Sequence, residues 1–282
     1  MYINFVKYFK INLIVSILLV CVCIFYIITN SIDLGLEFTG GLNLELEYEK
    51  KVSLNIIRHV FKEFKDVKIK YYGSKKNIQI KVKKTHKDRN DFIVLIKNLI
   101  DSGAKVVKIE YIGAEVTKNI INNSIKAVFL SILLMFIYLM VRFDYINAIS
   151  AITILIHDII VVLGVISFFD LELDFSVMAA LFAVFGYVVN DTIIIFDRIR
   201  EIKKLYHLYN MTDIINIALN NTLSRTLMTS LSTLVVVIII LIFGNEYLFG
   251  FALTLFCGII IGTYSSIYIA TVPLLFFDTN KK

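Results

Sequence analysis

Six long apolar runs constrain the fold of this 282-residue chain more than any other feature of its sequence. A helix needs about 20 predominantly apolar residues to cross the hydrocarbon core of a bilayer. The runs contain most of the hydrophobic residues, which make up 58% of the chain, and very few of its charges. We therefore expect a membrane α-helical bundle with six transmembrane helices. The runs cover residues 11–29, 125–141, 146–169, 175–196, 227–243 and 249–277.

The first run follows Lys7 and Lys10, and a positive start before an apolar core is also the pattern of a secretory signal peptide. This run is longer than the apolar part of a signal peptide, and no A-x-A cleavage site comes after it. We therefore expect residues 1–29 to contain a first transmembrane helix that is retained.

Residues 30–123 are polar and rich in lysine, and they predict a folded domain between the first and second membrane helices. Helical spacing predicts one helix from the N-cap Ser53 to Phe64 and a second from Phe92 to Leu99. The order β-α-β-β-α-β is typical of an α+β ferredoxin-like fold. Period-two alternation predicts the strands at 42–48, 67–71, 78–82 and 106–111.

The short loops of the predicted bundle carry opposite charges on its two sides. The positive-inside rule then places both termini in the cytoplasm, the 30–123 domain outside it, and a cytoplasmic loop at 197–225 within the five-helix region 124–282. Very short linkers after the second, third and fifth runs predict antiparallel neighbouring helices. The basic side holds Lys7, Lys10, Arg142, Arg198, Arg200, Lys203, Lys204, Arg225, Lys281 and Lys282. The acidic side holds Asp170, Glu172, Asp174 and Glu246.

Several classes of function are excluded by composition and by missing motifs. The net charge of +6 comes from membrane-flanking segments and one amphipathic domain, so it does not indicate nucleic-acid binding. Cys21, Cys23 and Cys257 all lie in apolar runs, which leaves the polar domain without disulfides or a zinc site. No phosphate-binding loop and no nucleophile elbow is present. We expect no cofactor and no enzyme activity, with any energy supplied by a partner or an ion gradient.

Asp191 is a charged residue inside the fourth apolar run, and such residues are usually functional because they are costly to bury. It follows Asn190, which shares a helix face with the small residues Ala179, Ala183 and Gly186. Small residues at this spacing let a second helix approach closely. Asp191 is either a proton carrier or a structural carboxylate that bonds a neighbouring helix.

Arg225 begins the fifth run at a similar depth, and Thr229 and Ser232 continue its face. This column of a cation and hydroxyls could hold ordered water, although Arg225 is equally well explained as an interfacial anchor.

His157 and Asp158 lie in the middle of the third run, where they form either a relay site or a polar pair that locks helix packing. Gly258 and Gly262 form a GxxxG pattern, which indicates helix packing. An amphipathic segment at 212–219 would dock a partner or lie on the membrane surface.

Several motifs, in order along the chain, resemble the SecF branch of the SecD/SecF family, within the RND superfamily of transporters. A junction motif formed by Gly35, Glu37, Phe38, Gly40 and Gly41 resembles the family's G-x-D-F-x-G-G, with Glu37 in place of the usual Asp. The most specific similarity is the segment 186–201. Further similarities are at 112–116, 141–143, 157–158 and 224–230.

The resemblance implies an accessory subunit of the Sec protein-export machinery in the bacterial inner membrane. Family members work with SecD as a heterodimer and associate with the SecYEG channel, the motor SecA and a YajC-like accessory protein, in contact with membrane lipid. They use the proton motive force to promote late steps in the translocation of unfolded polypeptide. The resemblance implies that Asp191 and Arg225 form the proton pathway, with contributions from Asn190, His157 and Asp158.

We expect proton arrival at Asp191 to remove its attraction to Arg225 and to shift the helices, and the junction motif to transmit this shift to the outer domain. One alternative is half of another RND-type proton-coupled transporter, for a lipid or a small molecule. A second is a structural assembly factor without ion flux.

Overall fold

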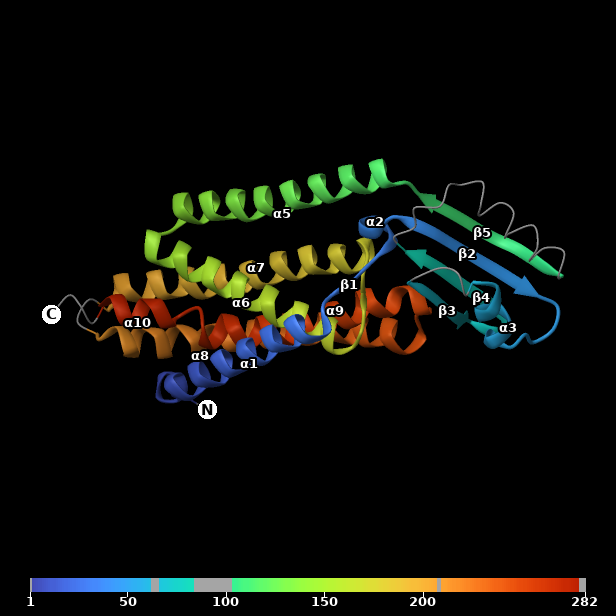
Figure 1. Cartoon of the computed structure of the whole chain (residues 1–282). Helices are drawn as coiled ribbons and strands as arrows, with labels where there is room; N and C mark the ends of the chain where they lie inside the picture. The colour runs from blue at the N-terminus through green and yellow to red at the C-terminus, as the bar shows by residue number, and fades with distance from the viewer. Residues whose placement is uncertain (1, 62–65, 84–102, 207–208, 279–282) are drawn as a thin grey trace. The chain divides into compact units, whose positions relative to one another are not determined.

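The fold was analysed in a computed structural model that describes residues 2–61, 66–83, 103–206 and 209–278. The chain forms two compact units, one of residues 1–33 and 128–282 and one of residues 34–127. Six helical segments of the described residues are long and apolar enough to span a membrane, which confirms the predicted number. Figure 1 shows the helices and strands with their labels.

The membrane unit is built from helices, most of which run past the ends of the apolar runs, and the first part of the helix at 114–142 belongs to the second unit (Figure 1). Linkers of a few residues separate the second helix from the third, the third from the fourth and the fifth from the sixth, as the sequence predicts. The segments are η1 (Val6–Tyr8), α1 (Phe9–Asn30), α5 (Ala114–Arg142), α6 (Tyr145–Phe168), α7 (Phe175–Leu205), α8 (Met211–Phe243), α9 (Glu246–Tyr268) and α10 (Val272–Asp278). Two-residue strands β1 (Asp33–Leu34) and β6 (Glu172–Leu173) lie next to α1 and α7 in the sequence.

The helices of the structure differ from the predicted apolar runs at three places. The expected loop at 197–225 is mostly helical, because α7 continues to Leu205 and α8 begins at Met211. The end of α7 and the start of α8 are polar but helical, because several polar residues form helix as readily as apolar ones do. The second membrane helix already begins at Ala114. The last apolar run is divided into α9 and α10 near Pro273, whose ring cannot occupy a helix interior.

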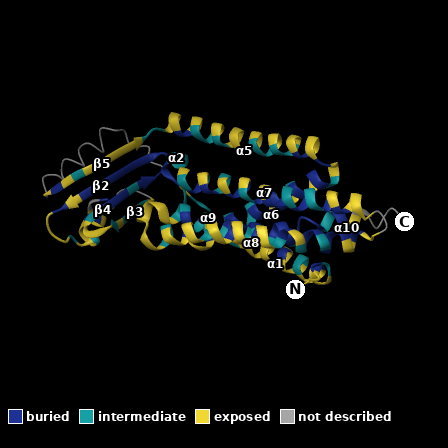
Figure 2. Cartoon of the chain, turned by 180° about the vertical axis from the view of Figure 1, so that it is seen from behind, coloured by how far each residue is buried: buried dark blue, intermediate teal, exposed yellow. Residues whose placement is uncertain are grey.

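The core of the membrane unit lies where α6, α7 and α9 pack together, and these helices hold most of the buried residues in Figure 2. Gly258 and Gly262 of α9 face α7 so closely that a Cβ atom at either position would overlap Val184 or Val188. The GxxxG pattern therefore packs two helices of the same chain. Helix α5, in contrast, is exposed along most of its length.

The second unit contains a four-stranded antiparallel sheet with the strand order β3-β4-β2-β5, and these strands confirm the four predicted ones. One face carries the apolar row Ile69, Ile80, Leu44 and Ile109, which runs across all four strands. Helix α3 packs on the apolar core of this unit. The elements are α2 (Leu36–Thr39), β2 (Gly41–Tyr48), α3 (Leu54–Val60), β3 (Val67–Tyr72), β4 (Ser74–Lys83) and β5 (Ala104–Ile112).

Ser53 caps α3 as predicted, since its hydroxyl oxygen accepts a hydrogen bond from the Asn55 N–H. The predicted end of this helix at Phe64, the whole second helix from Phe92 to Leu99, and the C-terminal pair Lys281 and Lys282 lie outside the described residues.

The opposite face of the sheet is polar and hydrogen-bonded. Gln79 donates to Asn43 over 3.1 Å, and Asn43 donates to Glu110 over 2.9 Å. Lys108 also contacts Glu110, and these two donors together hold the pKa of Glu110 below its usual value. Asn43 and Gln79 are buried in the middle of this face, and their hydrogen bonds satisfy polar groups that would be costly to bury unpaired.

We predict that Gly258→Val destabilises the membrane unit, because its side chain would occupy the space now filled by Val184. The expected loss is about 1–3 kcal/mol, the usual range for overpacked cores. Thermal unfolding of the detergent-solubilised chain, followed by circular dichroism, measures it. Gly186→Ala is the matched control, since no atom lies within 4 Å of an added Cβ there. An equal loss in both variants would contradict the close α7–α9 contact.

Candidate functional site

Asp191 lies on α7 inside the helix bundle, and only 1% of its surface is exposed. Neither carboxylate oxygen accepts a hydrogen bond from any residue that the structure describes. A carboxylate without donors in an apolar interior is strongly disfavoured as an anion unless a cation is nearby. This arrangement makes the charge of Asp191 sensitive to its surroundings.

Arg225 on α8 is the cation that acts on Asp191, through Coulomb attraction across space. The two side chains do not form a hydrogen bond, because both Asp191 oxygens are without a partner among the described residues. Arg225 itself is exposed in this chain. The structure thus brings the two predicted residues close enough to interact but leaves them unjoined, so movement of either helix would change their attraction.

A network of buried and half-buried hydroxyl groups connects α7, α8 and α9. The Tyr187 hydroxyl donates to Ser230 over 2.6 Å, and Ser230 shares a 2.8 Å hydrogen bond with Thr263. One turn before Ser230, the buried Thr226 hydroxyl has no partner among the described residues. The sequence interpretation missed this network, although Thr226 and Ser230 have helical i, i+4 spacing.

The predicted hydroxyl column of Thr229 and Ser232 lies with Arg225 on the exposed face of α8. Both residues are exposed, and their hydroxyls donate to backbone carbonyls of their own helix. Periodicity correctly groups residues on a face, but α8 carries hydroxyls on two faces, and the buried face is the one with Thr226 and Ser230.

His157 and Asp158 form a buried polar cluster with Ser265 of α9. The His157 Nδ1 atom lies 2.8 Å from Asp158 Oδ1, and the Ser265 hydroxyl donates to Asp158 Oδ2 over 2.7 Å. The His157 Nε2 atom is buried and has no partner among the residues described. The cluster joins α6 to α9, which fits the interpretation as a packing pair, while the unpaired nitrogen leaves the relay interpretation open.

The small residues of α7 do share one face, and this face is uncovered in the described chain. Ala179, Ala183, Gly186 and Asn190 are all exposed. Their side chains leave a smooth surface along the helix that carries Asp191. No helix that the structure describes packs into it at Gly186, where an added Cβ would meet no atom within 4 Å.

The junction motif forms a tight turn within the second unit. Gly35 precedes the four-residue helix α2, and Glu37 and Phe38 lie in that helix. Gly40 and Gly41 follow with φ angles of 69° and 138°, which favour glycine. A Cβ at Gly40 would come within 3.2 Å of the Ile112 carbonyl oxygen, and one at Gly41 would overlap the Val82 carbonyl.

Two further sequence interpretations concern docking and metals. The amphipathic segment at 212–219 forms the first turns of α8, and Ile215, Ala218 and Leu219 are buried in the chain's own core. It is therefore not free to dock a partner or to lie on the membrane surface. Among the described residues, no group of three His, Cys, Asp or Glu side chains is arranged to hold a metal ion.

Two family models match the chain. The model described as "Protein export membrane protein SecD/SecF, C-terminal" matches residues 94–280, and the model described as "SecD/SecF GG Motif" matches residues 25–52. The second match contains the whole junction motif.

Curated relatives named protein translocase subunit SecF are similar over almost the full chain. The protein of Calditerrivibrio nitroreducens is 38% identical, with 99% of this chain and 95% of the relative covered. The Pseudomonas aeruginosa protein is 34% identical, with coverages of 99% and 93%.

Solved structures of SecDF share this fold. The Thermus thermophilus protein, described as a translocon-associated membrane protein, has a TM-score of 0.87 and 29% identity over 99% of this chain. SecDF in a super-membrane-facing form has a TM-score of 0.73 and 27% identity over 100% of this chain. In both cases this chain spans 39% of the solved chain.

We predict that Ser265→Ala destabilises the bundle by about 1–3 kcal/mol, because it leaves the buried Asp158 Oδ2 atom without its hydroxyl donor. Ser266→Ala is the control. Ser266 is equally buried, but its hydroxyl donates only to the Thr263 backbone carbonyl. Thermal unfolding of both variants should show the larger loss for Ser265. Similar losses would mean that Asp158 does not depend on this bond.

We also predict that Gly41→Ala destabilises the second unit more than Gly73→Ala does. Both glycines have positive φ angles, but no atom lies within 4 Å of a Cβ at Gly73. Gly73→Ala should therefore cost only the backbone strain, about 1–2 kcal/mol. Gly41→Ala must also displace strand β4. Protease resistance of the second unit measures the difference, and equal resistance would contradict the steric role of Gly41.

Proposed function

The chain belongs to the SecD/SecF family of protein-export membrane proteins, and from this we propose that it is an accessory subunit of the bacterial Sec export machinery. In this role it uses the proton motive force to promote late steps of polypeptide translocation across the inner membrane. The observation that carries the proposal is the Asp191 carboxylate, which is buried without hydrogen-bond donors among the described residues and is attracted by Arg225.

Proton binding changes the energy of this site directly. With Asp191 ionised, its attraction to Arg225 favours a close approach of α7 and α8. With Asp191 protonated, this attraction disappears and the neutral carboxyl is easier to bury. The two states favour different helix arrangements, and this difference is what an ion gradient needs in order to do mechanical work. The junction motif then transmits the movement to the outer unit.

Asn190, His157 and Asp158 are assigned supporting roles along the same pathway. Asn190 is exposed on the uncovered face of α7, next to Asp191. His157 contributes the Nε2 atom that has no partner among the described residues. The Asp158 carboxylate holds the imidazole ring by contact with the Nδ1 atom of His157.

The proposed topology places both termini in the cytoplasm and residues 30–123 outside it. The support is the positive-inside rule together with the ends of α1, α5 and α7, which carry Lys10, Arg142 and Lys203. The strand order β3-β4-β2-β5 supports a ferredoxin-like fold for the outer unit.

The proposed partner in the membrane is SecD. The exposed small residues of α7 and the exposed Arg225 would lie against it, because a surface of this kind permits close helix approach. The pair would work with the SecYEG channel, SecA, a YajC-like accessory protein and the translocating polypeptide. The similarity to the Thermus thermophilus SecDF, which is described as translocon-associated, supports this setting.

We predict that Asp191→Asn abolishes the part of precursor export that depends on the proton gradient. Asparagine is nearly isosteric, but it carries no exchangeable charge for Arg225 to attract. Export into inverted membrane vesicles, with and without an ionophore, measures this part. The variant should export at the level that wild type shows after the gradient is collapsed.

Asp213→Asn is the matched control, because Asp213 is exposed in the first turn of α8. It should leave gradient-dependent export unchanged. Full gradient-dependent export in Asp191→Asn would remove this residue from the mechanism. Co-purification of the chain with an efflux partner instead of a translocon would favour an RND-type small-molecule transporter.

A further inference from the structure

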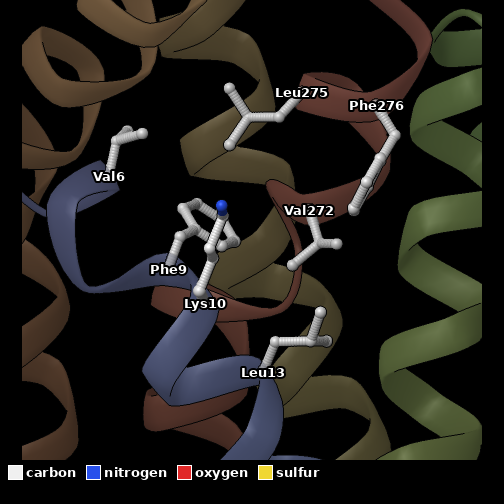
Figure 3. Close-up of a pocket in the computed structure, with 7 residues that line it drawn as sticks. All are labelled: Val6, Phe9, Lys10, Leu13, Val272, Leu275 and Phe276. Atoms are coloured by element: carbon white, nitrogen blue, oxygen red, sulfur yellow. The ribbon is translucent and has the colours of Figure 1, made fainter.

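A cavity of about 280 Å³ lies between the start of α1 and the helix α10, and none of the candidate proton-pathway residues lines it. Figure 3 shows its lining side chains, which come from the N-terminal segment on one side and from α10 on the other. Six of the seven are apolar. The lining residues are Val6, Phe9, Lys10, Leu13, Val272, Leu275 and Phe276.

The cavity is bordered by surface of the kind that faces lipid. Ile11 and Ile14, which follow the lining residues on α1, are 60% and 58% exposed. Phe276 on the opposite side is 64% exposed. Large apolar side chains with this exposure on a membrane-spanning helix are covered by hydrocarbon or by another apolar segment.

Among the described residues that line the cavity, Lys10 is the one with a charge. Figure 3 shows its amino nitrogen among the apolar lining side chains. It is exposed and forms no ion pair with any residue that the structure describes. Lys7 lies three residues earlier and adds a second positive charge at the same end of α1. An ammonium group at the end of a membrane helix is stabilised by an anion at the membrane surface.

We propose that this cavity binds one acyl chain of an anionic phospholipid whose phosphate pairs with Lys10. Basic pockets between membrane helices are a known kind of lipid headgroup site. The volume is slightly below the range of pockets for drug-sized ligands, which suits a single acyl chain. The proposal goes beyond the export function and does not depend on it, because the site lies apart from the proton-pathway residues and needs only a membrane-embedded α1.

The absence of tryptophan from the chain allows a direct test. Phe276→Trp places a single fluorescent reporter at the cavity. The full chain is reconstituted in phosphatidylcholine nanodiscs that contain a small, equal fraction of brominated phosphatidylglycerol or brominated phosphatidylcholine. Bromine quenches tryptophan only at close range. We expect the anionic lipid to quench with a preference of about fivefold, as one basic contact at the membrane surface would give.

Two further variants in the reporter background separate headgroup and chain binding. Lys10→Gln should bring the preference close to onefold. Val272→Phe should fill the cavity and weaken quenching by both lipids. Lys203→Gln is the charge-matched control, since Lys203 is exposed near the end of α7 and does not line the cavity. It should keep the preference.

Three results would overturn the proposal. Equal quenching by the two lipids would mean that no anionic headgroup is selected. A preference that disappears in Lys203→Gln but survives in Lys10→Gln would place the binding site elsewhere. No quenching by either lipid would mean that a protein segment, not lipid, covers the cavity.

Discussion

The burial of the Asp191 carboxylate is the constraint on which the rest of the membrane unit depends. Its two oxygens lie inside the bundle without a hydrogen-bond donor among the described residues. Such a group is tolerated only as a neutral acid or under the attraction of a cation, here Arg225 on the next helix. In the proposed mechanism, the position of α8 relative to α7 and the proton on Asp191 are therefore linked, and a change in one alters the free energy of the other.

The packing of the surrounding helices determines which helix contacts can change when Asp191 gains or loses a proton. On one side α7 is held firmly, because Gly258 and Gly262 bring α9 into direct contact with Val184 and Val188. The Asp158–Ser265 hydrogen bond fixes α9 to α6 in turn. The exposed face of α7 with Gly186 and Asn190 has no such contact in the described chain. Movement driven by Asp191 is therefore expected toward α8 and the uncovered face, since interfaces formed by close packing resist deformation.

The sequence predicts the parts of this structure that hydrophobicity and turn chemistry specify. Six apolar runs yield six helices, and period-two alternation locates the four strands with their apolar row. The ends of α7 and α8 were missed because polar residues there form helix as readily as the apolar ones before them. Among the site residues, a charge in an apolar run identifies Asp191 as buried. The buried hydroxyls of α8 were missed, because Thr226 and Ser230 have the same i, i+4 spacing as the exposed Arg225 and Thr229, and spacing alone does not show which face is buried.

The central claim is that Asp191 gains and loses a proton inside the folded protein. Infrared difference spectroscopy of the reconstituted chain measures this directly, since a protonated carboxyl group has its own carbonyl band. The account predicts a band that changes with pH, is missing in Asp191→Asn, and changes at a different pH in Arg225→Gln. A folded chain with no pH-dependent carboxyl band assignable to Asp191 would contradict it. A band that changes at the same pH in Arg225→Gln as in the wild type would also contradict it.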